Sequence, residues 1–172
     1  TAQGKFAKGA EKGDIYDVEV YKTNPYPWSL ALSNGKSQQL RHIVIQDRTI
    51  VEDGEVVLAG LDEALRFVRL ESVTTGASLP EGKTDLVDHI TAYYTDGTTE
   101  TISALQADAH GNITVTFDGE KVCDGYDIVF AEDYEMQAGG QVRFHAYTVY
   151  RDPEHTHVPD GQTKVTYTNA AR

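Results

Sequence analysis

The chain has 172 residues, and 27 acidic residues against 15 basic ones give it a formal net charge of -12. This excess of carboxylates argues against nucleic acid as a partner, because phosphate recognition depends on clustered lysine and arginine. Hydrophobic residues make up 40% of the chain, so we expect one domain with a sizeable core, with two small domains as the alternative. The single cysteine, Cys123, excludes an internal disulfide bond.

The first segment, 1–14, contains three lysines and three glycines with little apolar surface. This composition predicts a linker or flexible lead-in, followed by a single β-sandwich domain over 15–172. No apolar run in the sequence is long enough to span a bilayer. The first residues also lack the apolar core of a signal peptide, so we expect a signal or an anchor to lie outside this chain.

Along the rest of the chain, segments rich in Val, Ile, Thr and Tyr alternate with Asn-Gly, Asp-Gly and Gly-Gly turns. This pattern predicts strands joined by tight turns and favours an all-β fold, an immunoglobulin-like β-sandwich. The spacing of Leu61, Leu65 and Val68 also allows one short helix over 61–70, where Phe67 and Leu70 fit a strand equally well. The predicted strands are 15–23, 29–33, 40–47, 56–58, 86–95, 113–117, 126–131, 141–150 and 163–169.

Three polar residues end the apolar face of a predicted strand. Side chains alternate along a strand, so each of these residues shares its face with the apolar residue two positions earlier. An amine, a carboxyl and a carboxamide are therefore expected to face the core. The residues are Lys22, Asp47 and Asn169.

Burying such groups singly costs several kcal/mol each, so we expect the three groups to lie together in the core and satisfy one another's hydrogen bonds. Burial also disfavours the charged forms of an amine and a carboxyl. A neutral Lys22 is then able to attack the side-chain carbonyl carbon of Asn169, while Asp47 hydrogen-bonds the carbonyl oxygen and relays protons. Ammonia leaves and an amide remains. Because this happens once, the chain is not an enzyme in the turnover sense.

Short motifs around these residues are similar to a known family. The segments 20–23 (VYKT), 43–47 (IVIQD) and 165–169 (VTYTN) resemble the A-type isopeptide domains of the collagen-binding adhesin family, found in Gram-positive adhesins and pilins. In that family a lysine lies on the first strand, an aspartate ends a hydrophobic-x-hydrophobic-x-Asp strand, and an asparagine lies on the last strand. The resemblance implies that Lys22 and Asn169 form the cross-link and that Asp47 is the acid that promotes it.

The resemblance further implies an extracellular stalk or adhesive domain, anchored to the cell wall through regions outside this chain. Neighbouring domains of the same surface protein are the expected partners, and the domain is expected to be a monomer. An alternative function is a ligand-binding adhesin domain that recognises a host protein or glycan through the aromatic stretch around Trp28 or the loop at His155. A third is a carbohydrate-active accessory module without a cross-link.

Each proposed site residue also has an ordinary interpretation. Lys22 fits a strand-end lysine whose amine reaches water, and Asp47 fits a turn residue. Asn169 alone fits an ordinary terminal residue. Asn24 is an alternative amide, but it lies too close to Lys22 in sequence to cross the domain.

Two histidines and the cysteine are further groups with possible chemistry. His155 and His157 have the spacing of metal ligands, but Pro153 and Pro159 argue against a regular strand there. We interpret this segment as a solvated loop and expect no metal and no cofactor. The acidic loops lack the spaced oxygen ligands of a calcium loop. Cys123 has no histidine nearby in sequence, which predicts an inert or partly exposed thiol.

Overall fold

A computed structural model of the chain describes residues 5–6, 9–35, 38–73, 86–108, 111–155, 158, 161–162 and 164–172, with residues 5, 6, 9–11 and 155 described by their backbone alone. Its helical elements are α1 (Val18–Thr23) and the short 3-10 helix η1 (Pro153–His155). Its strands are β1 (Lys5–Phe6), β2 (Gly9–Ile15), β3 (Tyr26–Ser33), β4 (Val44–Asp47), β5 (Ile50–Glu52), β6 (Glu55–Leu58), β7 (Leu65–Val73), β8 (Val87–Tyr94), β9 (Thr99–Ile102), β10 (Thr114–Thr116), β11 (Cys123–Phe130), β12 (Gln141–Tyr150) and β13 (Val165–Ala171).

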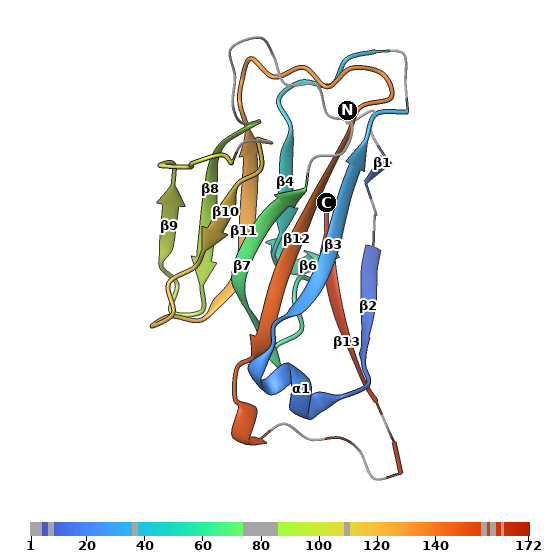
Figure 1. The fold of residues 1–172 in the computed structure, drawn as a ribbon, viewed down its shortest axis with the longest axis vertical. Helices are drawn as coiled ribbons and strands as arrows, with labels where there is room; N and C mark the ends of the chain where they lie inside the picture. Colours follow the sequence, from blue (N-terminus) through green and yellow to red (C-terminus); the bar gives the residue numbers. More distant parts are fainter. Residues whose placement is uncertain are drawn as a thin grey trace.

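The described strand pairs are antiparallel and build a sandwich, which confirms the expected all-β fold (Figure 1). In one layer β12 lies between β3 and β7, with β1 beside β3 and β10 beside β7. In the other layer β11 lies between β4 and β8, with β9 beside β8. The layers are joined where Phe67 of β7 pairs with Cys123 of β11.

The core lies between these layers and is filled from alternate positions of the strands. Leu30 of β3 and Phe144 of β12 face Ile90 of β8 and Ile128 of β11, and all belong to one buried apolar cluster. Burying each such side chain contributes about 1.5–3 kcal/mol to folding. Trp28 also lies in this core, and its indole nitrogen donates a hydrogen bond of 3.0 Å to the Thr148 hydroxyl.

Strand β2 pairs with β13 along one side of the sandwich (Figure 1). In this register Glu11 lies opposite Asn169. The end of β13 also reaches β4, because Gln46 and Arg172 exchange backbone hydrogen bonds of 2.7 and 2.8 Å. Asn169 is therefore held on a strand with neighbours on both sides.

The prediction of a lead-in over 1–14 is wrong for residues 9–14, which belong to β2. Strand pairing uses backbone groups, so the segment needs few apolar side chains to be ordered. Polar contacts add to it: Lys164 and Thr166 donate to the Asp14 carboxylate at 2.8 and 2.6 Å. The hydrogen bond from Lys164, followed by that from Thr166, holds the pKa of Asp14 below its usual value.

The predicted strand over 15–23 is also wrong, because most of this segment forms α1. The Asp17 carboxylate accepts a hydrogen bond of 3.2 Å from the backbone nitrogen of Val20, as an N-cap residue does. The helix ends at Thr23, with Asn24 as its C-cap in extended backbone, and Pro25 follows. A proline disfavours helical backbone in the residue before it. Val18 is buried while Val20 is exposed, so the valine alternation does not mark one apolar face.

The short helix allowed over 61–70 is wrong, because β7 begins at Leu65. Before it, the Asp62 carboxylate accepts a hydrogen bond of 2.9 Å from the Ala64 backbone nitrogen and forms a turn. Leu65, Phe67 and Leu70 are buried against the core. Pairing with β10 and β12 fixes the segment as a strand. β12 has its predicted bounds, whereas β5 and β9 lie outside every predicted strand.

Candidate functional site

Two of the three predicted site residues meet in the core. Asp47 ends β4 and Asn169 lies near the end of β13, and the Asn169 side-chain nitrogen Nδ2 donates a hydrogen bond of 3.1 Å to Asp47 Oδ2. Asp47 is 0% exposed and Asn169 is 5% exposed. Ile45 and Tyr167, two positions earlier on each strand, are buried with them. The alternation of side chains therefore predicts this pair correctly.

A third residue completes the contact. Tyr126 of β11 lies directly opposite Asp47 in the strand register, and its hydroxyl donates a hydrogen bond of 2.7 Å to the same oxygen, Oδ2. The Tyr126 ring packs edge-on against Phe67 and is stacked with Phe117. Sequence reasoning missed Tyr126, although it begins the predicted strand 126–131 and a buried tyrosine hydroxyl needs a hydrogen-bond partner.

Lys22 does not join Asp47 and Asn169. It lies in the last turn of α1, where its amine forms an ion pair of 2.8 Å with Glu19, and its side chain is 27% exposed. Figure 1 shows α1 at one end of the molecule, away from the end of β13 that carries Asn169. The expectation that Lys22 faces the core from a strand is therefore wrong, because the segment is helical.

The contact between Asp47 and Asn169 also differs from the expected one in its atoms. Asp47 accepts from the amide nitrogen, whereas we expected it to bond the carbonyl oxygen. Among the described residues, no donor reaches the buried carbonyl oxygen Oδ1 of Asn169. The amide nitrogen is the atom that leaves as ammonia when an amine replaces it. The Asp47 carboxyl thus lies within hydrogen-bond distance of this nitrogen, at a distance suited to proton transfer.

The thiol of Cys123 lies close to this site but is chemically quiet. Its side chain is 0% exposed, and Sγ donates to the carbonyl oxygen of Gly125 at 3.2 Å. Burial, with a smaller contribution from the negative charges of Asp124 and Asp47, raises the pKa of the Cys123 thiol to about 12. A protonated, buried thiol is a poor nucleophile, which agrees with the predicted inert thiol.

A second cluster begins at the residue after Asp47. Arg48 forms an ion pair of 2.8 Å with Asp127, and the Tyr93 hydroxyl donates to the other oxygen of Asp127 at 2.9 Å. The guanidinium carbon of Arg48 lies 4.6 Å from the centre of the Tyr93 ring. Gly125 packs against Arg48 so closely that a Cβ there would lie 2.4 Å from the Arg48 Cβ. This cluster fixes the backbone that follows Asp47.

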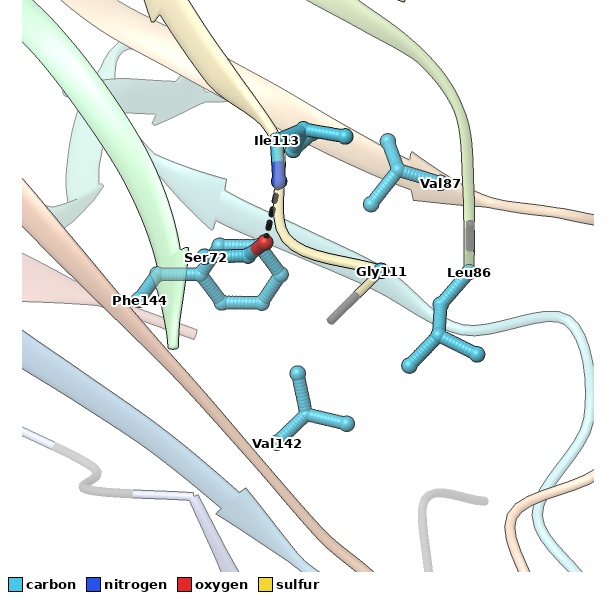
Figure 2. A pocket seen from close by; sticks show the side chains of 7 residues that line it. All are labelled: Ser72, Leu86, Val87, Gly111, Ile113, Val142 and Phe144. Atoms are coloured by element: carbon cyan, nitrogen blue, oxygen red, sulfur yellow. Dashed lines mark hydrogen bonds between the residues drawn. The ribbon is translucent and has the colours of Figure 1, made fainter. Parts of the chain in front are cut away.

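Other candidate sites carry less chemistry. A small pocket of about 10 Å³ lies between the layers and is lined mainly by apolar side chains, including Leu86, Val142 and Phe144 (Figure 2). Its hydroxyl, Ser72 Oγ, accepts a hydrogen bond of 2.8 Å from the Ile113 backbone nitrogen (Figure 2). The pocket therefore offers little polar recognition to a ligand.

Across the part of the chain that the structure describes, no group of three or more His, Cys, Asp or Glu side chains is placed to hold a metal ion. The histidines considered as ligands, His155 and His157, lie outside the side chains described. Because Trp28 is buried in the core, it does not contribute to an exposed aromatic surface. None of the described helices is both long and apolar enough to cross a membrane.

Fold and site together define an antiparallel β-sandwich with a buried carboxyl–carboxamide pair. Comparison with known protein families finds no match, and comparison with curated proteins finds none either. Among solved structures, the chain is similar to the CBM3a-L domain, with flanking linkers, of scaffoldin cipA from the cellulosome of Clostridium thermocellum. The identity is 10% and the TM-score 0.21, over 96% of this chain and 88% of that one. A similarity this low has no bearing on function.

Proposed function

We propose that this chain is an extracellular stalk or adhesive domain of a cell-surface protein, in which Asn169 forms an intramolecular amide bond with a lysine. The observation that carries the proposal is the 3.1 Å contact between Asp47 and Asn169, two polar side chains buried in the core. Leaving a buried amide oxygen without a donor costs about 1–3 kcal/mol. This cost in stability is explained if the pair has a chemical function.

The reaction is a transamidation. A neutral lysine amine attacks Cγ of Asn169, the new C–N bond forms, and the bond from Cγ to Nδ2 breaks. The attacking amine gives up a proton to Asp47, and Asp47 supplies a proton to Nδ2, so that ammonia leaves and the carboxyl is regenerated. Burial supports this chemistry, because it excludes water from the carbonyl and favours a neutral amine.

The source of the amine follows from the strand order. The family resemblance implies a lysine on the first strand, and the first strands here are β1 and β2, which precede α1. β2 lies beside β13, which carries Asn169. Lys12 of β2 is exposed and lies opposite Thr168, one position from Asn169. Lys5 of β1 is the other lysine on these two strands, and we assign the amine to it in preference to Lys22.

Intact mass spectrometry tests the proposal. The wild-type chain is expected to weigh less than its sequence by the mass of one ammonia, and Asn169→Ala to have its full sequence mass. Peptide mapping then identifies the amine: Lys5→Arg is expected to abolish the cross-linked peptide. Lys22→Arg is the matched control and is expected to keep it.

Two results contradict the proposal in different ways. A full, unreduced mass for the folded wild-type chain means that no cross-link forms. A cross-linked peptide that contains Lys22 means instead that the amine comes from α1. The assignment of the lysine from the order of strands is then wrong.

A further inference from the structure

We propose that Tyr126 is a positioning residue for this reaction, whose hydroxyl holds the Asp47 carboxyl with Oδ2 turned toward the leaving nitrogen of Asn169. The inference rests on the proposed cross-link. It assigns a role to a residue that neither the family motifs nor the alternation of side chains singles out.

The first support is that Tyr126 and Asn169 donate to one and the same oxygen. The Tyr126 hydroxyl lies 2.7 Å from Asp47 Oδ2, and Asn169 Nδ2 lies 3.1 Å from it. The terminal torsion of an aspartate is broad and roughly two-fold, so packing alone selects its orientation weakly. A short hydrogen bond to one oxygen supplies the missing restraint and keeps that oxygen at the leaving group.

The second support is that Tyr126 is itself fixed. Tyr126 is 0% exposed, and the centre of its ring lies 5.0 Å from that of Phe67 and 5.9 Å from that of Phe117. Its backbone pairs on both sides, with Asp47 of β4 and Ala92 of β8. The hydroxyl therefore has little freedom, and such rigidity is what a group that orients another group requires.

The third support is chemical. When Asp47 gives its proton to the departing nitrogen, a carboxylate is left in the core until the proton from the amine replaces it. The hydroxyl of Tyr126 donates to that carboxylate. A hydrogen bond to an ionised acceptor is about twice as strong as one between neutral groups, so this contact strengthens when charge appears.

Tyr126→Phe tests the inference, because it removes the hydroxyl and keeps the ring. The chain is purified in the unfolded state and then transferred to folding conditions. Its loss of ammonia is followed over time by mass spectrometry. We expect the bond to form roughly tenfold to hundredfold more slowly in this variant. Tyr134→Phe is the matched control: Tyr134 is buried and stacked on Phe130, and it is expected to react at the wild-type rate.

A pH profile separates positioning from simple loss of stability. Losing a donor to the ionised carboxylate favours the protonated form of Asp47, so the fall in rate at high pH is expected to move to higher pH. Two titratable groups described near Asp47 are the Tyr126 hydroxyl, which this variant lacks, and the Cys123 thiol, whose pKa burial raises to about 12. Tyr134→Phe is expected to leave the profile unchanged.

The outcomes distinguish the two proposals. If the wild-type chain never loses ammonia, the cross-link itself is refuted. If the wild-type chain reacts and Tyr126→Phe reacts at the same rate with the same pH profile, only the role of Tyr126 is refuted. A slower rate with an unchanged pH profile also refutes the positioning role, because reduced folding then accounts for the loss.

Discussion

Two tyrosine–aspartate pairs each have one member on β11, at the adjacent residues Tyr126 and Asp127, and they have different surroundings. Tyr126 donates to Asp47 in the core, whereas Tyr93 donates to Asp127, which also receives the guanidinium of Arg48. A carboxylate bonded to a guanidinium and a hydroxyl is a structural contact. A buried carboxyl in contact with a carboxamide instead lies beside a group with which it is able to exchange a proton. The two pairs therefore differ in the second group that contacts the carboxyl, which is a guanidinium at Asp127 and a carboxamide at Asp47.

Exchanging each aspartate for its amide gives the largest expected difference. Asp47→Asn removes the group that transfers protons and is expected to slow bond formation by at least about 100-fold. Asp127→Asn makes the same substitution nearby and is expected to leave the reaction rate unchanged. Loss of ammonia, followed by intact mass spectrometry, measures both. An equal slowing in the two variants contradicts the distinction between the pairs.

Gly125 tests whether the Arg48 cluster supports the fold. Gly125→Ala places a Cβ 2.4 Å from the Arg48 Cβ, and we expect a loss of about 1–3 kcal/mol in the free energy of unfolding. Urea unfolding in an Asn169→Ala background measures this without a cross-link. Gly119→Ala is the control, because a Cβ at Gly119 meets nothing within 4 Å. Equal stabilities in the two variants would show that the Arg48 side chain moves aside at little cost in the free energy of unfolding.

Tyr93→Phe gives the smallest expected effect, a loss of about 0.5–1.5 kcal/mol for one hydrogen bond. Burial, and then the hydrogen bond to Asp127, raises the pKa of Tyr93 above its usual 10.0. A raised pKa in the folded state means that the contribution is complete below pH 10 and is lost as pH rises through the folded value. The stability difference between wild type and Tyr93→Phe is therefore expected to shrink at alkaline pH. A difference that grows above pH 10 contradicts this sign.

The sequence predicts part of the site well, and physical reasons explain where it succeeds. Asp47 ends β4 and Asn169 lies near the end of β13, and the residues two positions before them are buried, so their side chains have to face the core. The same reasoning fails for Lys22, because Asp17 caps a helix and Pro25 follows it. A short segment of valines and charged residues fits either structure, and local capping decides between them.

Other features were missed because their stabilising contacts are not visible in composition. β2 is ordered by backbone pairing with β13, so its glycines and lysines resemble a linker in sequence. Tyr126 was recognised as part of a strand, but the partner of its hydroxyl comes from β4, distant in sequence. Contacts of this kind follow from the register of strands, which short motifs do not specify.

The register of β2 and β13 has a mechanical consequence. Gly9 lies opposite Ala171, while Ile15 lies opposite Val165, so the outer ends of both strands lie at the same end of the pair. Tension applied to the chain through these ends loads one hydrogen-bonded rung at a time and unzips the strands, instead of shearing all rungs together. Asn169 lies only two residues from Ala171, so an amide bond there would stop the peeling almost at its start. Force spectroscopy on Asn169→Ala is expected to show unfolding at lower force than wild type, with β2 and β13 separating first.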